Sequence, residues 1–251
     1  MIKKIYDACS ADLLFLKDLK QNIFLKENLF LIESLKVYKK SIQSNIKIEK
    51  VITTQEVHDE NKDFFKSQEV LITSSEILNK LIKFKSHTKV FAIGKIPNNK
   101  INYNDDIILF NNITSPENVG AITRSALAFN INQIVYDKGS LNPWNRRSVR
   151  VSTGNIFKFN TKRILDTESF INDLKAKEYD ILSMANSKGS VSIKNYNGKN
   201  KKLIILGSEG HGIEKSIMEA SDKILKIPVN EFVEHLNVGH AAAITFYQLK
   251  S

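Results

Sequence analysis

Cysteine, arginine and long apolar runs are scarce in this chain of 251 residues. Cys9 is the single cysteine, which excludes an internal disulfide and a cysteine-rich metal site. No apolar run approaches the roughly 18 residues that a membrane-spanning helix needs, and the N-terminal residues contain no signal-peptide hydrophobic region. The sequence therefore predicts a cytoplasmic globular protein, and its 42% of hydrophobic residues is sufficient to bury a core.

Positive charge is in excess, because 37 lysines and arginines against 27 acidic residues give a net charge of +10. This excess favours a polyanionic partner, with nucleic acid as the first choice and an acidic membrane surface as the second. Lysine supplies most of the charge, and all arginines fall in one window: Arg124, Arg146, Arg147, Arg150 and Arg163. A guanidinium group can bind a phosphate through two hydrogen bonds, so this clustering of arginines predicts contacts with phosphate groups. The alternative interpretation is that these arginines only form surface salt bridges.

The first part of the chain alternates between strand and helix patterns. Strands are expected at 28–33, 47–53, 70–73 and 89–94, and helices at 12–22, 34–44, 56–66 and from Ser74 or Ser75 to about 84. A turn-rich break at 97–105 predicts a domain boundary, with one domain at 1–104 and a second at 105–251. The first 104 residues contain 18 lysines and 12 acidic residues, a net charge of +6. They are therefore expected to contact the polyanion.

The second part reads as further alternating strands and helices. Strands are expected at 106–110, 132–136, 156–159, 179–185, 203–206 and 223–227, and helices at 118–129, 166–177 and after each of the last two strands. Residues 137–148 have the length and charge of an exposed functional loop, and 186–200 are polar and loose. The alternation predicts an α/β fold with a parallel sheet that is covered on both faces.

Two loops near the carboxyl terminus follow strands directly. GSEGHG occupies 207–212, and PVNEFVEHLNVG occupies 228–239. Glycine lets a backbone approach a ligand closely, and loops at the carboxyl ends of adjacent strands are where open α/β sheets bind small molecules. The spacing G-x-x-G-x-G is not the dinucleotide fingerprint, and a simple turn would also account for this loop alone. Together, the two loops indicate that 202–249 form the cofactor-binding half of an enzyme.

Three segments occur in a characteristic order. They are SPENVGAITRSALAFN (115–130), followed by RVSTG (150–154); LGSEGHGI (206–213); and IPVNEFVEHLNVGHAAA (227–243). In this order and spacing they resemble the SpoU-type RNA ribose methyltransferases of the knotted SPOUT superfamily. The resemblance covers 106–251, and 20–37 resemble more loosely the small RNA-binding domain that often precedes it. It implies a deep trefoil knot, a homodimer formed through the C-terminal domain and S-adenosylmethionine as cofactor. The implied reaction is 2′-O-methylation of structured RNA, with ribosomal RNA favoured over transfer RNA.

The resemblance also implies a role for individual residues. The implied catalytic residues are Asn118, Arg124, Glu209 and Asn237, with Asn118 and Gly120 shaping the first loop. The implied cofactor-binding residues, acting mostly through backbone groups, are Gly207, Gly212, Ile227, Pro228, Leu236 and Val238. His235 and Gly239 stand where the family usually has serines. Cofactor binding is therefore expected to be kept, whereas the positioning of the target ribose is open to change.

Arg124 and His235 carry the chemistry that can be argued from side chains alone. A guanidinium can hold a phosphate and stabilise a developing alkoxide, but it stays protonated, so a role for Arg124 as general base is left open. The imidazole of His235 titrates near working pH and is either a general base or a residue that only packs. A metal cluster of His211, His235, His240 and Glu234 is not favoured, because the spacing of His235 and His240 is unlike a helical metal-binding pair.

The long loop combines Arg146, Arg147 and Arg150 with Trp144. An aromatic ring among arginines suits stacking on an unpaired base beside phosphate contacts, so these four residues are the predicted RNA-binding set. Trp144 can equally be a lid that packs on the sheet.

Two rival functions are compatible with the sequence. One is a paralogue that binds RNA without turnover, which would bind the cofactor without transferring methyl groups. The other is an unrelated nucleotide-binding α/β enzyme, which would prefer a nicotinamide cofactor to S-adenosylmethionine.

Overall fold

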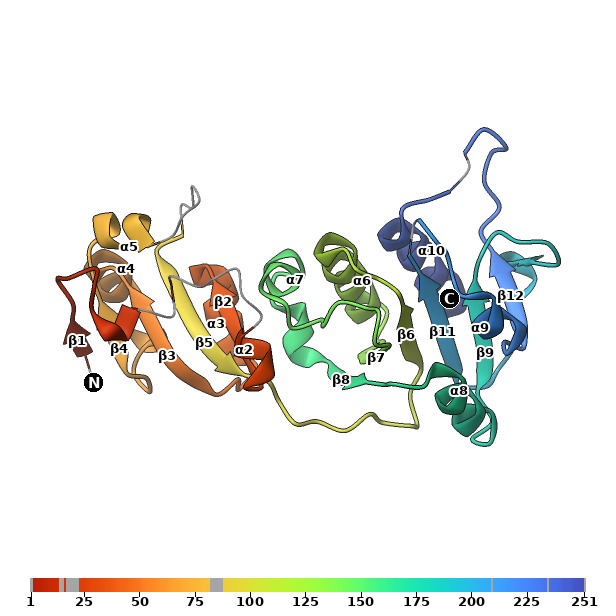
Figure 1. Ribbon diagram of the computed structural model, residues 1–251, viewed down its shortest axis with the longest axis horizontal. Helices are drawn as coiled ribbons and strands as arrows, with labels where there is room; N and C mark the ends of the chain where they lie inside the picture. Colours follow the sequence, from red (N-terminus) through yellow and green to blue (C-terminus); the bar gives the residue numbers. More distant parts are fainter. Residues whose placement is uncertain are drawn as a thin grey trace. The chain divides into compact units, whose positions relative to one another are not determined.

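The computed structural model in Figure 1 describes residues 2–13, 16, 23–81, 88–208, 210–233 and 235–250. The chain forms two compact units. The first contains Met1–Pro97 and Trp144–Phe157, and the second contains Asn98–Pro143 and Lys158–Ser251. The sequence placed one boundary near 104 and did not anticipate that 144–157 would group with the first unit.

The first unit contains a mixed sheet of five strands in the order β1-β4-β3-β5-β2. The strands are β1 (Ile2–Lys4), β2 (Leu29–Glu33), β3 (Ile48–Thr53), β4 (Val70–Ile72) and β5 (Val90–Lys95). β1, β4 and β3 run parallel, whereas β5 is antiparallel to both of its neighbours. The strands expected at 28–33, 47–53, 70–73 and 89–94 are confirmed within two residues.

Several helices of the first unit begin at side-chain caps. They are α2 (Ile23–Lys26), α3 (Leu35–Gln43), α4 (Gln55–Glu60), α5 (Ser75–Leu81) and α7 (Arg146–Val151), with 3-10 turns η1 (Ala11–Leu13), η2 (Lys62–Phe64) and η3 (Asn155–Lys158). Ser34 caps α3, Thr54 caps α4, and the Ser74 hydroxyl accepts from the Ile77 amide at 3.2 Å. The helix expected at 12–22 lies mostly outside the described residues, as does the end of the one expected at 74–84. The helix expected at 56–66 already ends at Glu60.

Residues 144–157 correct the expectation of one exposed loop at 137–148. Trp144 is only 2% exposed, and its ring lies 4.8 Å from that of Phe30 and 6.1 Å from that of Phe157, centroid to centroid. α7 begins directly after this buried ring and packs beside β2. The strand expected at 156–159 is wrong, because η3 occupies that stretch and β8 begins only at Asn160.

The second unit is built on seven parallel strands in the order β10-β12-β9-β11-β6-β7-β8. The strands are β6 (Ile107–Asn111), β7 (Gln133–Tyr136), β8 (Asn160–Arg163), β9 (Asp180–Met184), β10 (Val191–Ser192), β11 (Lys202–Gly207) and β12 (Lys223–Lys226). The helices are α6 (Pro116–Ala128), α8 (Thr167–Lys175), α9 (Lys215–Glu219) and α10 (Val238–Lys250), with the 3-10 turn η4 (Ile193–Asn195). The expected parallel sheet is confirmed.

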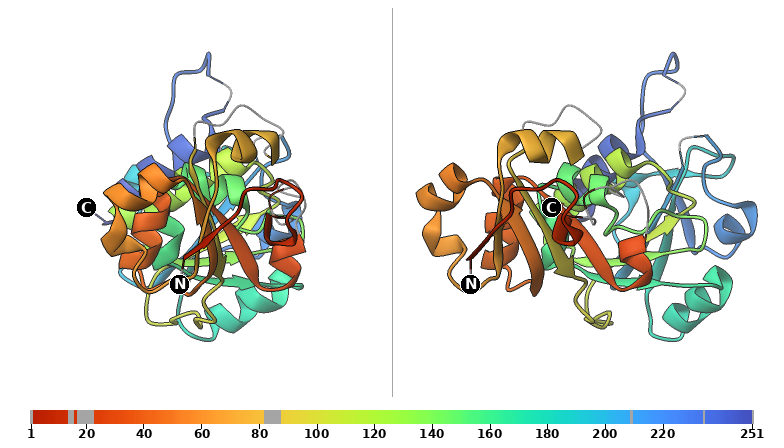
Figure 2. Two further views of the ribbon diagram at one scale, coloured as in Figure 1. Left: turned by 90° about the vertical axis from the view of Figure 1, so that its left-hand side faces the viewer. Right: turned by 60° about the vertical axis from the view of Figure 1, so that its left-hand side comes forward.

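Helices cover both faces of this sheet (Figure 1 and Figure 2). α6 and α10 pack against each other on one face, and α8 and α9 lie on the other. The α8 and α9 face buries a continuous apolar cluster, in which Leu109 and Ile205 of the central strands meet Phe170 and Ile217 of the helices. The buried central strands fix the sheet, so their carboxyl ends are rigid places from which loops can build a site.

Three sequence expectations for this unit need correction. β11 and β12 are not adjacent, because β9 lies between them. α6 begins at Pro116 rather than at 118, since the Ser115 hydroxyl caps it and Pro116 occupies its first turn. Asn118 and Gly120 therefore lie on the helix and not in a loop. Residues 186–200 are not wholly loose, because they contain β10 and η4.

Across the described helices, no segment combines the length and apolarity that a membrane span requires. The trefoil knot that the resemblance implies stays a prediction.

Candidate functional site

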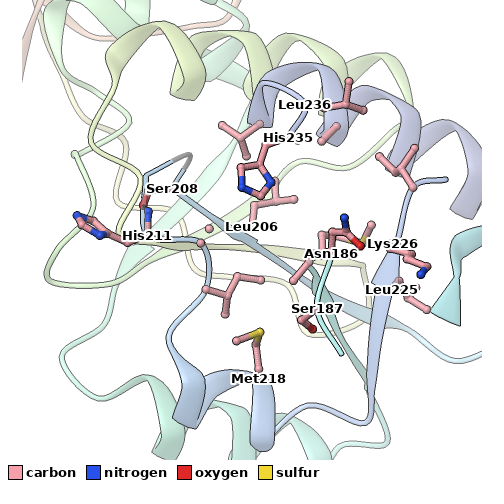
Figure 3. Close-up of a pocket in the computed structure, with 18 of the residues that line it drawn as sticks. Asn186, Ser187, Leu206, Ser208, His211, Met218, Leu225, Lys226, His235 and Leu236 are labelled. Carbon is pink, nitrogen blue, oxygen red and sulfur yellow. Dashed lines mark hydrogen bonds between the residues drawn. The ribbon is translucent and has the colours of Figure 1, made fainter. Parts of the chain in front are cut away.

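A pocket of about 360 Å³ opens at the carboxyl ends of β9, β11 and β12. Its walls come from the ends of these strands, from the loops that follow them, and from α9 and α10; Figure 3 draws most of the lining residues. The residues that line it are Met184, Ala185, Asn186, Ser187, Leu206, Gly207, Ser208, Gly210, His211, Gly212, Ile213, Met218, Leu225, Lys226, Ile227, Val229, His235, Leu236, Val238 and Ala241. This is the edge at which open α/β sheets bind small molecules.

The loop after β11, residues 207–212 and here called the glycine loop, folds back on itself. The Gly212 amide donates to the Ser208 carbonyl at 2.8 Å, and Gly212 has a positive φ of 67°. A Cβ at Gly207 would collide with the Gly212 backbone, so a side chain there would force the loop open. Gly207 and Gly212 both line the pocket, and their binding of the cofactor stays a prediction. Glu209, which was predicted to be catalytic, lies outside the described residues.

The loop after β12 joins the pocket to α6 through Asn237. The Asn237 side-chain amide donates to the Asn118 side-chain oxygen at 3.0 Å, across 119 residues of sequence. The Asn237 side-chain oxygen accepts from the Gly239 amide at 2.9 Å and so satisfies the first turn of α10. The first and third sequence segments therefore meet at one hydrogen bond. Ile227, Leu236 and Val238 line the pocket beside it.

A family model, described as SpoU rRNA Methylase family, matches residues 106–247, more than half of the chain. The chain belongs to this family. It is similar to the 23S rRNA (guanosine(2553)-2'-O)-methyltransferase RlmP of Bacillus subtilis, with 25% identity over 70% of this chain and 71% of that protein. It is also similar to an uncharacterized tRNA/rRNA methyltransferase of Borreliella burgdorferi, with 25% identity over 85% of this chain and 96% of that protein. Three mycobacterial relatives are matched over 50% to 64% of their own length.

A crystal structure of an AdoMet-bound rRNA methyltransferase from Sinorhizobium meliloti has a similar fold, with a TM-score of 0.86 over 98% of this chain and 97% of that chain. At 18% identity, this likeness shows the fold alone. As a member of the SpoU rRNA methylase family, the protein is an RNA methyltransferase.

The pocket of this SpoU family member fits S-adenosylmethionine. Its volume lies within the range of about 300–1,000 Å³ that is typical of small-molecule sites. Leu206, Leu236 and Met218 give apolar walls suited to an adenine ring, and the folded-back glycine loop presents main-chain groups at the same edge. Bound cofactor supplies a methyl group already activated by its sulfonium.

The segment after β9 was missed by the sequence reasoning. Met184, Ala185, Asn186 and Ser187 form one wall of the pocket because β9 is inserted between β11 and β12. A polar turn after an apolar strand was visible in the sequence, but the strand order that brings it to the site was not. Pro228, predicted to bind the cofactor, lies next to Ile227 but is not among the lining residues.

Arg124 lies on the exposed side of α6. Within the described part of the chain it forms neither an ion pair nor a hydrogen bond, so its guanidinium is available to a substrate. His235 lines the pocket, and in Figure 3 its ring lies beside Leu206. Both roles considered for His235, general base and packing residue, are compatible with this place.

Gly239, which stands where the family pattern usually has a serine, is closely surrounded. A Cβ at Gly239 would lie 2.9 Å from the Ala121 Cβ and 3.0 Å from the Asn237 side-chain oxygen. Since α6 and α10 pack closely here, a larger residue would push them apart or disturb the hydrogen bond of Asn237. In this chain the glycine therefore preserves the contact between α6 and the pocket loop.

The three arginines of α7 differ in their surroundings. Arg146 Nε lies 3.5 Å, and Arg150 Nη1 3.6 Å, from a carboxylate oxygen of the buried Glu33. Burial lowers the pKa of the Arg146 guanidinium, and Glu33 opposes this shift. Arg147 is exposed, whereas Trp144 is in the core of its unit and presents no open ring face for a base. The histidines do not come together as a metal site, since no three His, Cys, Asp or Glu residues cluster within the described chain.

Proposed function

We propose that the protein methylates a ribose 2′-hydroxyl of ribosomal RNA. The observation that carries the proposal is the hydrogen bond between Asn118 and Asn237, which ties the helix bearing Arg124 to the loop that lines the cofactor pocket. One further observation favours ribosomal RNA over transfer RNA, because the Bacillus subtilis relative is named as a 23S rRNA methyltransferase. The net charge of +10 suits either polyanion.

The protein contributes to this reaction mainly by aligning the cofactor with the ribose, and less by forming bonds of its own to the reacting groups. Main-chain groups of Gly207, Ile227 and Leu236 would hold the cofactor in the pocket, and α6 would hold the ribose beside it. Fixing two reactants in line can lower the barrier by several kcal/mol. Arg124 is proposed to contact the neighbouring phosphate and to stabilise the negative charge that develops on the 2′-oxygen as its proton leaves.

Ribosomal and transfer RNA can be distinguished with labelled cofactor. Purified ribosomal and transfer RNA from cells lacking the gene should be incubated separately with the protein and S-adenosylmethionine carrying a tritiated methyl group. We expect incorporation into ribosomal RNA only. Incorporation confined to transfer RNA would overturn the preference, and cofactor binding without incorporation would support the RNA-binding paralogue.

We also propose that the protein is a homodimer through the C-terminal unit. On α10, Ile244 and Tyr247 are exposed apolar side chains, and the Tyr247 ring lies 6.0 Å, centroid to centroid, from that of Phe129, the residue that follows α6. An apolar surface formed by two long helices suits burial against a second copy. Light scattering should therefore give twice the chain mass of 28.5 kDa; a monomer at micromolar concentration would exclude this arrangement.

Arg147 and Arg150 are the two exposed arginines of α7, and we propose that Arg147 contacts the RNA backbone. Arg147→Ala is expected to weaken RNA binding by several-fold and to lower the slope of log affinity against log salt by about one. Binding should be measured by filter retention between 50 and 300 mM salt. Lys66→Ala is the matched control, because it removes an exposed cation of the same unit that is already paired with Asp63. An unchanged slope in Arg147→Ala would exclude a backbone contact.

A further inference from the structure

A polar cluster at the end of β6 lies against the glycine loop without lining the pocket. Asn111, the last residue of β6, pairs with Gly207 across the sheet and is only 1% exposed. Its side-chain oxygen accepts from the Glu214 amide at 2.9 Å, and its side-chain amide donates to the Asp137 carboxylate, also at 2.9 Å. The buried amide of Asn111 is therefore bonded on one side to the exit of the glycine loop and on the other to the end of β7.

The next residue extends the cluster. Asn112 has a positive φ of 59°, and its backbone amide donates to the Asp137 carboxylate at 3.0 Å. Its side-chain amide donates to Glu214 Oε1 at 2.5 Å. Asp137 is 5% exposed and also accepts from the Ser140 amide at 2.7 Å, so both of its oxygens are bonded. Within the described chain, the Asp137 carboxylate thus accepts from neutral donors at the end of β6 and in the loop after β7.

Glu214 has an unexpected orientation. It occupies the N-cap position of α9, where a carboxylate usually accepts from the first turn, yet it makes no capping hydrogen bond. Its carboxylate faces Asn112 instead, with Asn111 at 3.4 Å. The Glu214 side chain therefore bonds the end of the glycine loop to the residues at the end of β6, and it does not stabilise its own helix.

The glycine loop is held at both of its ends by this cluster. It enters at Gly207, which pairs with Asn111, and it leaves at Glu214, which bonds to Asn111 and Asn112. The pocket-lining residues between these two anchors are Ser208, Gly210, His211, Gly212 and Ile213. A glycine-rich segment has many accessible conformations, so fixing its ends removes an entropic penalty from ligand binding.

We propose that Asn111, Asn112, Asp137 and Glu214, here termed the β6 clasp, are positioning residues for S-adenosylmethionine. They hold the glycine loop in its cofactor-binding shape without touching the cofactor. The proposal rests on the proposed function, because it takes the pocket as the cofactor site. It predicts that weakening the clasp lowers affinity for the cofactor and leaves affinity for RNA unchanged.

The test compares two substitutions of the same residue by calorimetric titration of the full chain with S-adenosylmethionine. Glu214→Ala removes the acceptor of a charge-assisted hydrogen bond and is expected to weaken cofactor binding by about 10-fold or more. Glu214→Gln keeps an acceptor oxygen at the same place and is expected to stay within about threefold of the parent. Glu219→Ala is the control, because it removes an exposed carboxylate from the same helix, where it pairs with Lys215.

A second variant tests the partner of Glu214. Asn112→Gly permits the positive φ, retains the backbone amide and removes the side chain, so it should weaken cofactor binding at least as much as Glu214→Ala. The double variant should be no weaker than the weaker of the two single variants, because both remove the same bond. Additive losses would contradict the clasp.

Other outcomes separate this inference from the proposed function. If the parent protein binds the cofactor and Glu214→Ala binds it equally well, the clasp is wrong and the proposed function stands. If Glu214→Ala loses RNA affinity or thermal stability in proportion to cofactor affinity, its role is general folding, which also overturns the clasp. If the parent protein binds no S-adenosylmethionine, the proposed function fails and the clasp fails with it.

Discussion

Replacing Arg124 with alanine is expected to slow methyl transfer by about 10²–10³-fold. The guanidinium is the proposed source of positive charge beside the 2′-oxygen, and its loss removes an interaction that is strongest in the transition state. Binding of S-adenosylmethionine should be unchanged, because Arg124 is not among the pocket-lining residues. Folding should also be unchanged, because the side chain is exposed and unpaired within the described chain. Single-turnover transfer with saturating RNA measures the effect on the chemical step.

Two variants make the Arg124 experiment specific. Arg163→Ala removes an exposed arginine of the same unit, on the edge strand β8, and is expected to keep the parent rate. Arg124→Lys keeps the charge but loses the fork geometry, so its rate should lie between those of the parent and the alanine variant. If Arg124→Ala transfers methyl groups within threefold of the parent rate, the arginine has no part in the chemistry.

Replacing Glu33 with alanine is expected to destabilise the first unit by about 3 kcal/mol. Glu33 is 1% exposed and lies between Arg146 and Arg150, so its removal leaves a partly buried guanidinium without its counter-charge. The side chain of Arg150 is 46% exposed and that of Arg146 is 21% exposed, which allows water to compensate part of the loss. The effect should therefore fall at the lower end of the range for broken buried pairs.

The single tryptophan makes this measurement selective. Trp144 is buried in the first unit beside Phe30, so its fluorescence during urea unfolding reports on that unit. Glu56→Ala is the matched control, because it breaks an exposed pair with Lys89 and should shift stability by less than about 1 kcal/mol. A Glu33→Ala transition that coincides with the parent transition would show that the buried carboxylate contributes no net stability.

The central strands β6 and β11 were predictable because they are buried on both faces. β6 and β11 are nearly continuous apolar runs, and every residue from Ile107 to Phe110 is buried. β8 was missed because its residues, NTKR, are polar and lie on the edge of the sheet, where no burial pattern is imposed. The true start of α6 was legible in the sequence, since Ser115 followed by Pro116 is a cap followed by a first-turn proline.

The site was predictable only in part, because it depends on contacts between distant residues. The two loops could be placed at strand ends, but the position of β9 between β11 and β12 follows from sheet order, which local patterns do not encode. The hydrogen bond between Asn118 and Asn237 is likewise invisible in either segment alone. The family resemblance named both residues but did not predict that they pair. The burial of Trp144 could not be deduced from its polar neighbours in the sequence, because the ring of Phe30 on which it packs is more than a hundred residues away in the chain.

Mass-spectrometric mapping of ribose methylation tests the central claim most directly. Ribosomal RNA from cells lacking the gene should be incubated with the protein and S-adenosylmethionine carrying a deuterated methyl group, then digested and sequenced. The account predicts deuterated methyl on the 2′-oxygen of a defined nucleotide with the parent protein, and almost none with Arg124→Ala. Label on a base, or label that persists in the Arg124 variant, would contradict it.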